Sequence, residues 1–85
     1  MEYKQLVRVV EENHGTIAVA SSYEKGLQYL INTGWLTEME EVYVEEKGWV
    51  RIKDHFGENW QEEILKQDKN FFDGMYYFYE VDFAE

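Results

Sequence analysis

Residues 75–83, which read MYYFYEVDF, decide the fold because their side chains alternate in character at every position. The odd-numbered positions are all apolar or aromatic. The even-numbered positions begin with Tyr76 and Phe78 and end with Glu80 and Asp82. A period of two residues is typical of a β-strand, in which successive side chains point to opposite faces of the sheet. We therefore expect a strand here, with its aromatic stripe buried against the rest of the domain.

The beginning of the chain is expected to supply two antiparallel strands. Residues 3–11 fit a helical stripe as well as a strand, so their sequence alone is ambiguous. Their three valines, and the Asn13-His14-Gly15 segment that follows, favour a strand that enters a turn. Residues 16–20, TIAVA, then form the returning strand of a hairpin.

A second hairpin is expected in the middle of the chain. Residues 42–44 and 49–52 are short apolar segments that flank Glu45-Glu46-Lys47-Gly48. Glycine adopts a positive φ without steric cost, so Gly48 is suited to the turn. Each hairpin pairs its strands antiparallel.

Two helices are expected between these strands. The first begins at Ser21, which lies three residues before Glu24 as in a capping box, and it ends near Gly34. The second helix follows Asn59, which has the same spacing to Glu62. An apolar stripe at helical spacing supports the first helix, and it consists of Tyr23, Leu27, Leu30 and Ile31.

Together these elements predict an α+β fold with the order β-β-α-β-β-α-β. We expect a small two-layer domain spanning residues 1–85, with a mostly antiparallel sheet of about five strands and two helices on one face. A domain of this size buries only about 60–65% of the surface that its unfolded chain exposes. With no cysteine available for disulfides, the 15 aromatic residues are expected to supply much of the core.

The charge of the chain narrows the class of partner. It has 18 Asp or Glu against 8 Lys or Arg, a net charge of −10. Direct binding to nucleic acid or to anionic membranes is disfavoured, because both depend on basic residues. No apolar run approaches the ~20 residues of a membrane span, and the first residues lack a signal peptide. We expect a cytoplasmic protein that meets a basic partner.

No catalytic or metal-binding motif is evident. Ser21 and Ser22 stand at a helix start, where a capping role is expected. His14 and His55 lie 41 positions apart, without a histidine at helical spacing from either of them. There is no phosphate-binding loop, dinucleotide fingerprint or nucleophile elbow. We therefore expect a protein that is not an enzyme and needs neither a cofactor nor a metal.

The acidic residues are unevenly distributed, and this is the feature that bears on function. Five of them fall within the nine residues 38–46, further acids follow in the second helix, and others lie near the C-terminus. They are the predicted partner-binding residues, with a solubility-promoting surface as the alternative. Lys47, Arg51 and Lys53 are expected to pair with neighbouring acids across the second hairpin. The predicted binding residues are Glu38, Glu40, Glu41, Glu45, Glu46, Glu58, Glu62 and Asp82.

A comparison of charge spacing shows what such a surface requires. Duplex DNA carries one charge per ~1.7 Å of axis, whereas carboxylates on alternate residues of one strand lie ~6.7 Å apart. Carboxylates from several elements must therefore share one face. In size, charge and lack of cysteine the chain resembles small phage-encoded inhibitors, including DNA mimics and anti-CRISPR proteins. The resemblance implies an inhibitor that occupies the basic groove of a nucleic-acid enzyme.

Two functions are therefore predicted. The first is a small acidic non-enzymatic binding protein that inhibits or modulates a basic partner, such as a nucleic-acid-processing enzyme. The alternative is an interaction module that forms homo- or hetero-oligomers, including a homodimer, through exposed aromatic residues. Its candidates are Trp35, Trp49, Tyr76 and Phe78, because Trp and Tyr are enriched in binding hot spots.

Overall fold

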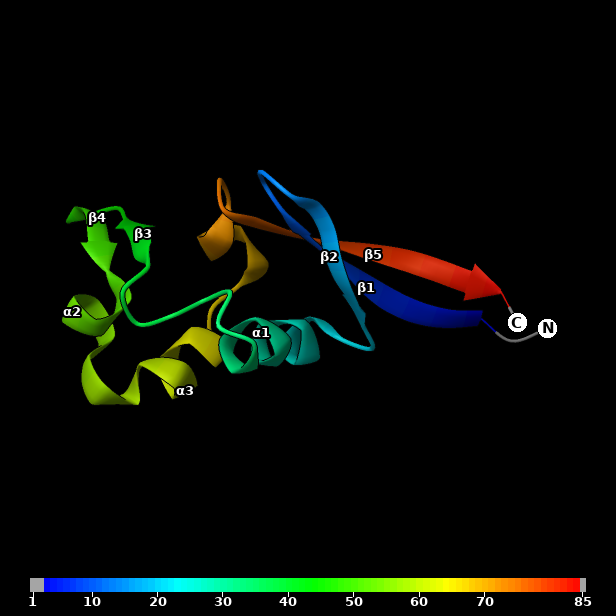
Figure 1. Ribbon diagram of the computed structural model, residues 1–85, viewed down its shortest axis with the longest axis horizontal. Coiled ribbons are helices and arrows are strands. Elements are labelled where there is room, and N and C mark those ends of the chain that lie inside the picture. The colour runs from blue at the N-terminus through cyan, green and yellow to red at the C-terminus, as the bar shows by residue number, and fades with distance from the viewer. Residues whose placement is uncertain (1–2, 85) are drawn as a thin grey trace.

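The computed structural model describes residues 3–84, and for residues 3–5 and 82–84 it describes the backbone only. The order of elements confirms the α+β class. The expected second helix after Asn59 is α3, and it is preceded by an additional short helix, α2, which includes Ile52 of the expected strand 49–52, and by a 3-10 turn. The elements are β1 (Tyr3–Glu11), β2 (Gly15–Ala20), α1 (Tyr23–Asn32), β3 (Glu41–Val44), β4 (Gly48–Arg51), α2 (Ile52–Phe56), η1 (Gly57–Asn59), α3 (Trp60–Leu65), η2 (Lys69–Phe72) and β5 (Tyr76–Ala84), and they are shown in Figure 1.

The five strands divide between two antiparallel sheets. A three-stranded sheet has the order β2-β1-β5, and a separate two-stranded sheet holds β3 and β4. Both predicted hairpins are present, with Gly15 and Gly48 at positive φ in their turns. The β3–β4 hairpin pairs with neither edge of the larger sheet, because it lies at the far end of the molecule, beyond η2 (Figure 1).

The register of β5 against β1 decides which stripe of β5 is buried. Val9 pairs with Phe78, and both point into the core, where they are 0% and 6% exposed. Arg8 pairs with Tyr79 on the opposite face, which is open. The mixed stripe of β5, and not its wholly apolar stripe, therefore faces α1. The mixed stripe can do so because it is aromatic where the strand crosses the body and acidic only where the strand leaves it.

Helix α1 packs closely on β1, and its ends are set by a side-chain cap at Ser22 and by the positive φ of Gly34. Ser22, rather than the expected Ser21, caps its start by accepting a hydrogen bond from the backbone nitrogen of Lys25 at 3.2 Å. Gly26 is buried, and a Cβ at this position would lie 3.0 Å from Cγ2 of Val9. Gly34 ends the helix as predicted, with a φ of 82°.

The second helical segment is interrupted, and its predicted cap is wrong. Gly57 has a φ of 77°, which ends α2 after five residues. Asn59 makes no side-chain capping bond at the start of α3. Asn59 is the last residue of the 3-10 turn η1, so α3 continues directly from a helical turn.

One core connects both sheets. Of the eleven buried core residues among those described, only Phe72, Tyr76 and Phe78 are aromatic, and the rest are Val, Leu and Ile. Most other aromatics, including Tyr23 and Trp60, are half-buried around it. The aromatic side chains therefore surround an aliphatic core more than they fill it.

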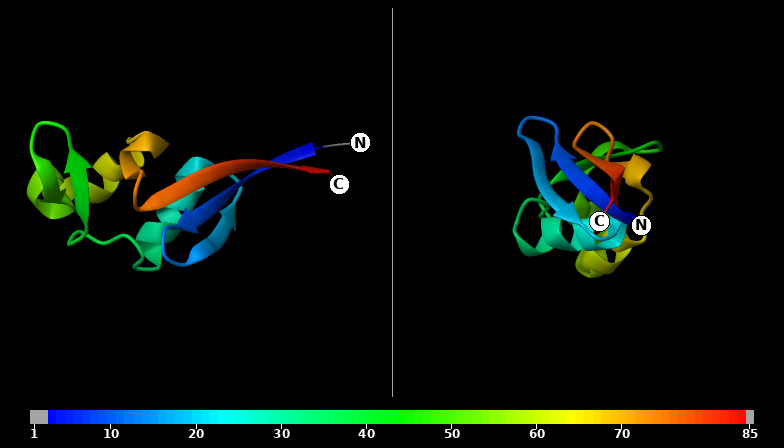
Figure 2. Two further views of the ribbon diagram at one scale, coloured as in Figure 1. Left: turned by 90° about the horizontal axis from the view of Figure 1, so that it is seen from above. Right: turned by 90° about the vertical axis from the view of Figure 1, so that its right-hand side faces the viewer.

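The molecule is elongated. Its principal extents are 47 × 24 × 22 Å, and its radius of gyration is 13.8 Å, against about 12 Å for a compact chain of this length. Figures 1 and 2 show β1 and β5 projecting together from the body as a ribbon that carries both termini. The β3–β4 hairpin, α2 and α3 lie at the other end.

Candidate protein-binding surface

The outer face of the β3–β4 hairpin exposes two large aromatic side chains. Val42 is fully buried beneath the hairpin, so the alternation of the strand turns its neighbour Tyr43 outward. Tyr43 pairs with Trp49 across the hairpin, and the two rings meet edge to face with their centroids 5.7 Å apart. They are 53% and 57% exposed. Glu41 and Arg51 form the next pair on the same outer face.

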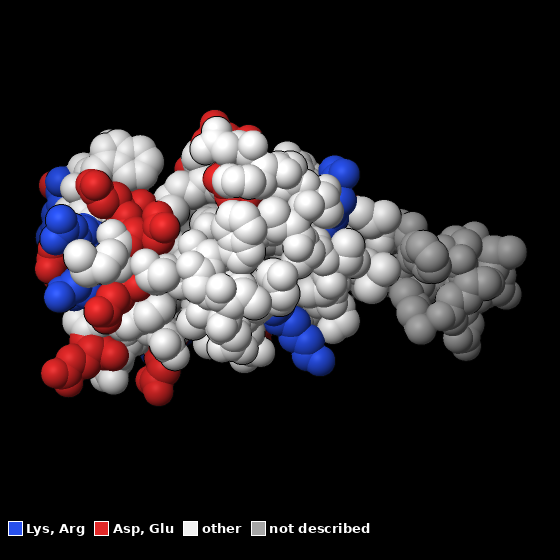
Figure 3. All heavy atoms as spheres, in the orientation of Figure 1, with Lys and Arg blue, Asp and Glu red and all other residues white. Residues whose placement is uncertain are grey.

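The end of the molecule that carries this aromatic pair is rich in carboxylates. We call residues 37–66 the acidic end, because they contain nine Asp or Glu and four Lys or Arg, a net charge of −5. Figure 3 shows charged side chains of both signs concentrated over this end and a largely uncharged surface over the middle of the molecule. Six of the predicted binding residues are exposed here, and the seventh, Glu40, is half-buried; the exposed six are Glu38, Glu41, Glu45, Glu46, Glu58 and Glu62.

Backbone hydrogen bonds fix the segment that carries the first of these acids. The amide of Ile52 donates to the carbonyl oxygen of Glu40 at 2.9 Å, and the amide of Lys53 donates to that of Glu38 at 2.9 Å. These bonds hold residues 38–40 against the start of α2. The turn that carries Glu45 and Glu46 is closed by a bond from the Lys47 amide to the Val44 carbonyl.

None of the seven predicted binding acids in the acidic end forms an ion pair with another described residue. Among the described residues, carboxylates make ion pairs at Glu11–His14 and at Glu63–Lys66. Glu41 and Arg51 are cross-strand neighbours in register, yet the expected ion pairing of Lys47, Arg51 and Lys53 is not formed. These seven carboxylates are therefore available to a partner, whereas Glu63 of the acidic end is paired with Lys66.

Asp82 is the predicted binding residue that the fold does not bring to this surface. It pairs with Gln5 near the end of β5, and that end of the strand lies at the opposite end of the molecule from the hairpin (Figure 1). Its side chain is outside the part of the structure that is described. Seven of the eight predicted residues therefore lie at one end of the molecule, and the eighth lies at the other.

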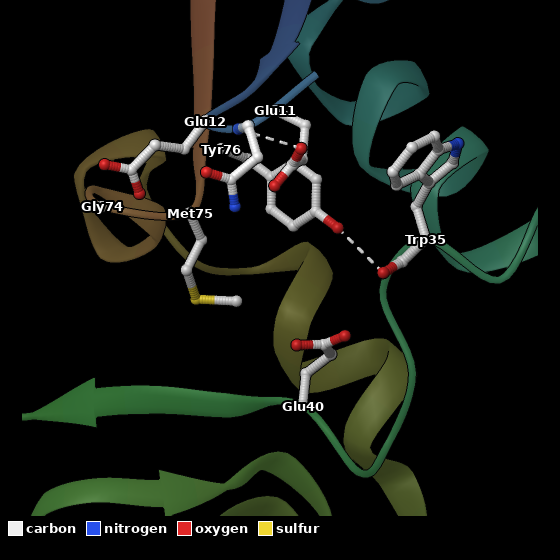
Figure 4. Close-up of a pocket in the computed structure, with 8 residues that line it drawn as sticks. Glu11, Glu12, Trp35, Glu40, Gly74, Met75 and Tyr76 are labelled. Carbon is white, nitrogen blue, oxygen red and sulfur yellow. Dashed lines mark hydrogen bonds between the residues drawn. The ribbon is translucent and has the colours of Figure 1, made fainter. Parts of the chain in front are cut away.

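A hollow of about 280 Å³ adjoins the acidic end. Figure 4 shows Glu11 and Glu12 on one side of it and Glu40 on the other, with the ring of Tyr76 between them. The hydroxyl of Tyr76 donates to the carbonyl oxygen of Trp35 at 2.8 Å. Three carboxylates from distant parts of the chain thus border one cavity that has an aromatic wall.

The hollow perturbs two of its own ionisable groups. Burial, and then the charges of Glu40 and Glu11, raise the pKa of Tyr76 to about 12. The pKa of Glu11 shifts in the opposite direction. A hydrogen bond from the His14 imidazole lowers it. The Asn13 amide, which donates to the same carboxylate at 3.1 Å, adds to this effect. The Glu11 carboxylate is thereby held in its charged form.

The sequence interpretation missed three residues of this surface. Tyr43 could have been found, because Val42 and Val50 alternate with it and with Trp49 along the hairpin. Glu11 and Glu12 could not, because they lie 28 or more positions from Glu40 and only the tertiary fold brings them together.

The exposed aromatics differ from those expected for an oligomeric module. Tyr76 and Phe78 belong to the core, where they are 4% and 6% exposed, so they are wrong as surface contacts. Trp35 is half-buried beside His14, whose ring lies 5.3 Å from it. Of the four candidates, only Trp49 is exposed.

Comparisons with protein-family models, with curated proteins and with solved structures found no match to this chain. Among the side chains that the structure describes, residues 6–81, no three His, Asp or Glu are grouped as metal ligands. No helix in the same part of the chain is long and apolar enough to cross a membrane. The function is therefore argued from the surface alone.

Proposed function

We propose that this protein is a small non-enzymatic binding protein whose acidic end docks on a basic surface of a partner protein. The partner we favour is a nucleic-acid-processing enzyme, which the protein inhibits or modulates. The observation that carries this proposal is the presence of seven carboxylates at one end of the molecule, where they make no ion pair within the described residues and where Tyr43 and Trp49 are exposed.

The arrangement has the composition of a binding interface. Trp and Tyr are enriched at interface centres, where they become desolvated, while charged groups at the rim guide association. Tyr43 and Trp49 supply such a centre, and Glu41, Glu45 and Glu46 surround it. Opposite charge on the partner raises the encounter rate and fixes orientation.

The hollow gives this surface a socket for a basic side chain. A Lys or Arg side chain of the partner would meet Glu11, Glu12 and Glu40 in it, beside the ring of Tyr76. Its cationic head would pair with the carboxylates, and its methylene stem would contact the aromatic wall. Hydrogen bonds from His14 and Asn13 keep Glu11 ionised for this contact.

The density of charge limits how much of a nucleic-acid groove is imitated. A 24 Å length of duplex, equal to the width of this molecule, carries about 14 phosphate charges. The acidic end carries nine acids and a net charge of −5. The surface therefore suits a confined basic patch on an enzyme and not the full length of its groove.

Catalysis is a weaker explanation for the same carboxylates. A general acid of the glycosidase type needs a carboxyl whose pKa is raised by burial. In the hollow, hydrogen bonding shifts the pKa of Glu11 downward, which is the opposite direction. The geometry thus supports binding of a cationic group more than proton transfer.

The proposal is tested by capture of host proteins on the immobilised chain. We expect the partner to be retained at ~0.05 M salt, released at ~0.5 M salt, and displaced by competing duplex DNA. Neutralising Glu41, Glu45 and Glu46 to Gln should abolish this retention, because it removes the charge around Tyr43 and Trp49.

A control triple variant changes the net charge by the same three units elsewhere. It carries Glu24→Gln, Asp73→Asn and Glu80→Gln, all at exposed positions outside the acidic end. This control should retain the partner. Equal loss in both variants would mean that overall charge matters and the acidic end does not. Retention that is insensitive to salt and to both variants would refute the proposal.

A further inference from the structure

The three-stranded sheet ends on one side in the long edge strand β5, and the 3-10 turn η2 lies beside the first part of this strand, around Tyr77–Tyr79. In the described part of the chain β5 has β1 on one side and no strand on the other. Exposed edges are usually shielded by charged side chains, especially lysine, or by proline, bulges or short length, and of these β5 has only the acids Glu80 and Asp82. β5 has nine residues with no Lys or Pro, and its register against β1 is uninterrupted. The other edge, β2, has six residues and an irregularity in its pairing with β1.

The register shows, for each residue of β5, whether its backbone N–H and C=O groups point toward β1 or toward the free edge. The amide of Glu12 donates to the carbonyl of Met75 at 3.1 Å, which extends the β1–β5 ladder by one pair. In an antiparallel ladder the bonding pairs alternate, so Tyr77, Tyr79 and Val81 also direct their backbone groups toward β1. Tyr76, Phe78 and Glu80 therefore direct theirs to the free edge.

We propose that β5 pairs antiparallel with β5 of a second copy of this chain, which joins two three-stranded sheets into one sheet of six strands. The two-fold axis passes through Tyr79, so that Phe78 of each copy exchanges backbone hydrogen bonds with Glu80 of the other. Tyr79 then faces its own counterpart in a non-hydrogen-bonded pair. This dimer is separate from the acidic end and does not depend on its function.

Charge selects this register over its neighbours. Centring the pair on Glu80 would place two Glu80 side chains directly opposite each other, which is destabilising. Centring it on Phe78 would place Asp82 opposite Gly74, where the strand has ended. With the axis at Tyr79, Glu80 faces Phe78 and Asp82 faces Tyr76, so no acid is opposite an acid.

The outer face of the sheet also favours a second copy of the same chain. Tyr79 is 46% and Val81 40% exposed, and Tyr77 stacks on Tyr79 with centroids 6.3 Å apart. Among the described residues of this face the one charged side chain is Arg8, whose guanidinium lies 5.3 Å over the Tyr79 ring. In the dimer, Tyr77 of one copy neighbours Val81 of the other, and this apolar strip becomes continuous. On this outer face no carboxylate enters the seam, whereas on the inner face Glu80 and Asp82 of each copy stand opposite Phe78 and Tyr76 of the other.

Two features of the overall shape agree with this pairing. β2 pairs only with Val7–Glu11, so residues 3–6 and 81–84 form a two-stranded ribbon, which is marginal in water without further support. The second copy supplies a third strand to this ribbon. The antiparallel arrangement also points the two acidic ends in opposite directions, farther apart than the ~10 Å screening length at 0.1 M salt.

Disulfide trapping tests both the dimer and its register, because the chain has no cysteine of its own. Opposed residues in a non-hydrogen-bonded pair have Cα atoms ~4.5 Å apart, which a disulfide can span. We expect Tyr79→Cys to form a covalent dimer under mild oxidation. The matched control, Val81→Cys, has similar exposure, but its two copies would lie ~13.6 Å apart along the strands and should not crosslink.

Sedimentation equilibrium from ~1 µM to ~1 mM provides a second readout that needs no crosslink. Glu80→Pro removes the outward amide and leaves the bonds to β1 intact, so it should weaken the dimer about 10- to 100-fold. Glu80→Ala keeps the amide and should not weaken it. Circular dichroism of both variants confirms that the fold is retained.

Three results would overturn the proposal. One is a monomer throughout this concentration range, combined with no crosslinking of Tyr79→Cys. Another is equal crosslinking at positions 79 and 81, which would show random collision. The third is a monomeric protein whose β5 edge instead binds an extended segment of another protein, with binding lost in Glu80→Pro. None of these results bears on capture of a basic partner through the acidic end.

Discussion

The sheet region and the acidic end are held together by different kinds of contact. β1 and β5 come from opposite ends of the chain and pair over nine residues, whereas β3 and β4 are adjacent in sequence and pair over four. The acidic end has nine acids in 30 residues, against seven in the 47 residues of the sheet region, 1–36 and 75–85. The long-range pairing of β1 with β5 organises the fold. The short β3–β4 hairpin presents exposed side chains with only four paired positions.

The two regions share a connection at η2. This 3-10 turn contacts both β3 and β5, and its Phe72 is fully buried, with its ring centroid 6.1 Å from that of Phe78. Helix α1 adds a second link, because Tyr23 donates to the Gln67 carbonyl beyond α3 at 2.7 Å. We therefore expect the two regions to unfold as one cooperative unit.

Phe72→Ala is the strongest test of that unity. Removing a buried phenylalanine costs about 3–5 kcal/mol, a large part of the stability of a domain this small. We expect the urea midpoint to fall sharply, with coincident transitions in circular dichroism and in tryptophan fluorescence, to which Trp49 and Trp60 contribute from the acidic end. The neighbouring half-buried Phe71 is the control, and Phe71→Ala should cost less. Two separated transitions in the wild type would show that the regions are independent.

Two glycines test how closely α1 is fitted to the sheet. In Gly26→Ala the new Cβ would lie 3.0 Å from Cγ2 of the fully buried Val9, and overpacking of this kind costs about 1–3 kcal/mol. In Gly34→Ala the new Cβ meets no atom within 4 Å. The free energy of unfolding should fall by about 1 kcal/mol, only because alanine disfavours a φ of 82°. Urea unfolding of each variant measures the difference. Rescue of Gly26→Ala by Val9→Ala would identify the contact, and a stabilised Gly26→Ala would contradict it.

Tyr76 joins the sheet region to the loop that leads to the acidic end. Tyr76→Phe should cost about 1 kcal/mol, because the Trp35 carbonyl loses the hydroxyl that donates to it. The folded pKa of Tyr76 is raised to about 12 from an ordinary value of 10, so the folded state binds this proton more tightly. Its contribution to stability is therefore present below pH 10 and lost as the pH rises toward 12.

Unfolding measured across this range should show the effect of the tyrosine directly. The wild type should lose more stability than Tyr76→Phe between pH 10 and 12. The remaining alkaline loss in the variant is expected from Tyr23, whose pKa burial also raises. Parallel curves for the two proteins would mean that Tyr76 ionises without constraint from the fold.

The sequence predicts the fold class and the order of elements well, because both depend on local patterns of residues. The alternation in 75–83, the two glycine turns and the stripe of α1 are visible without tertiary information. Alternation does not reveal which stripe of β5 faces the core. That depends on where α1 lies and on where the strand leaves the body. The same limit explains the division into two sheets and the cap at Ser22 instead of Ser21.

The binding surface likewise has a part that local sequence predicts and a part that only the tertiary fold determines. Six exposed acids between Glu38 and Glu62 are close in sequence, so their clustering could be predicted. The approach of Glu11 and Glu12 to Glu40, and the distance of Asp82 from all of them, follow from the tertiary fold. Local sequence therefore finds the acidic end but not the hollow beside it.

The smallest predicted effect tests whether the charge of the acidic end is dispensable for folding. Neutralising Glu41, Glu45 and Glu46 to Gln should raise stability by a few tenths of a kcal/mol at low salt, because like charges within reach of one another repel. The gain should vanish at ~1 M salt, where the screening length is only ~3 Å. Urea midpoints at both salt concentrations measure it.

The control for this measurement is again the triple variant at Glu24, Asp73 and Glu80, which changes the net charge equally. It should give no comparable gain, because Glu24 lies in the first turn of α1, where a negative charge is favourable. If neutralising the acidic end instead lowered stability at low salt, its carboxylates would be structural. The contrast between a region that folds the chain and a region that presents charge would then fail, since the same acids would serve both.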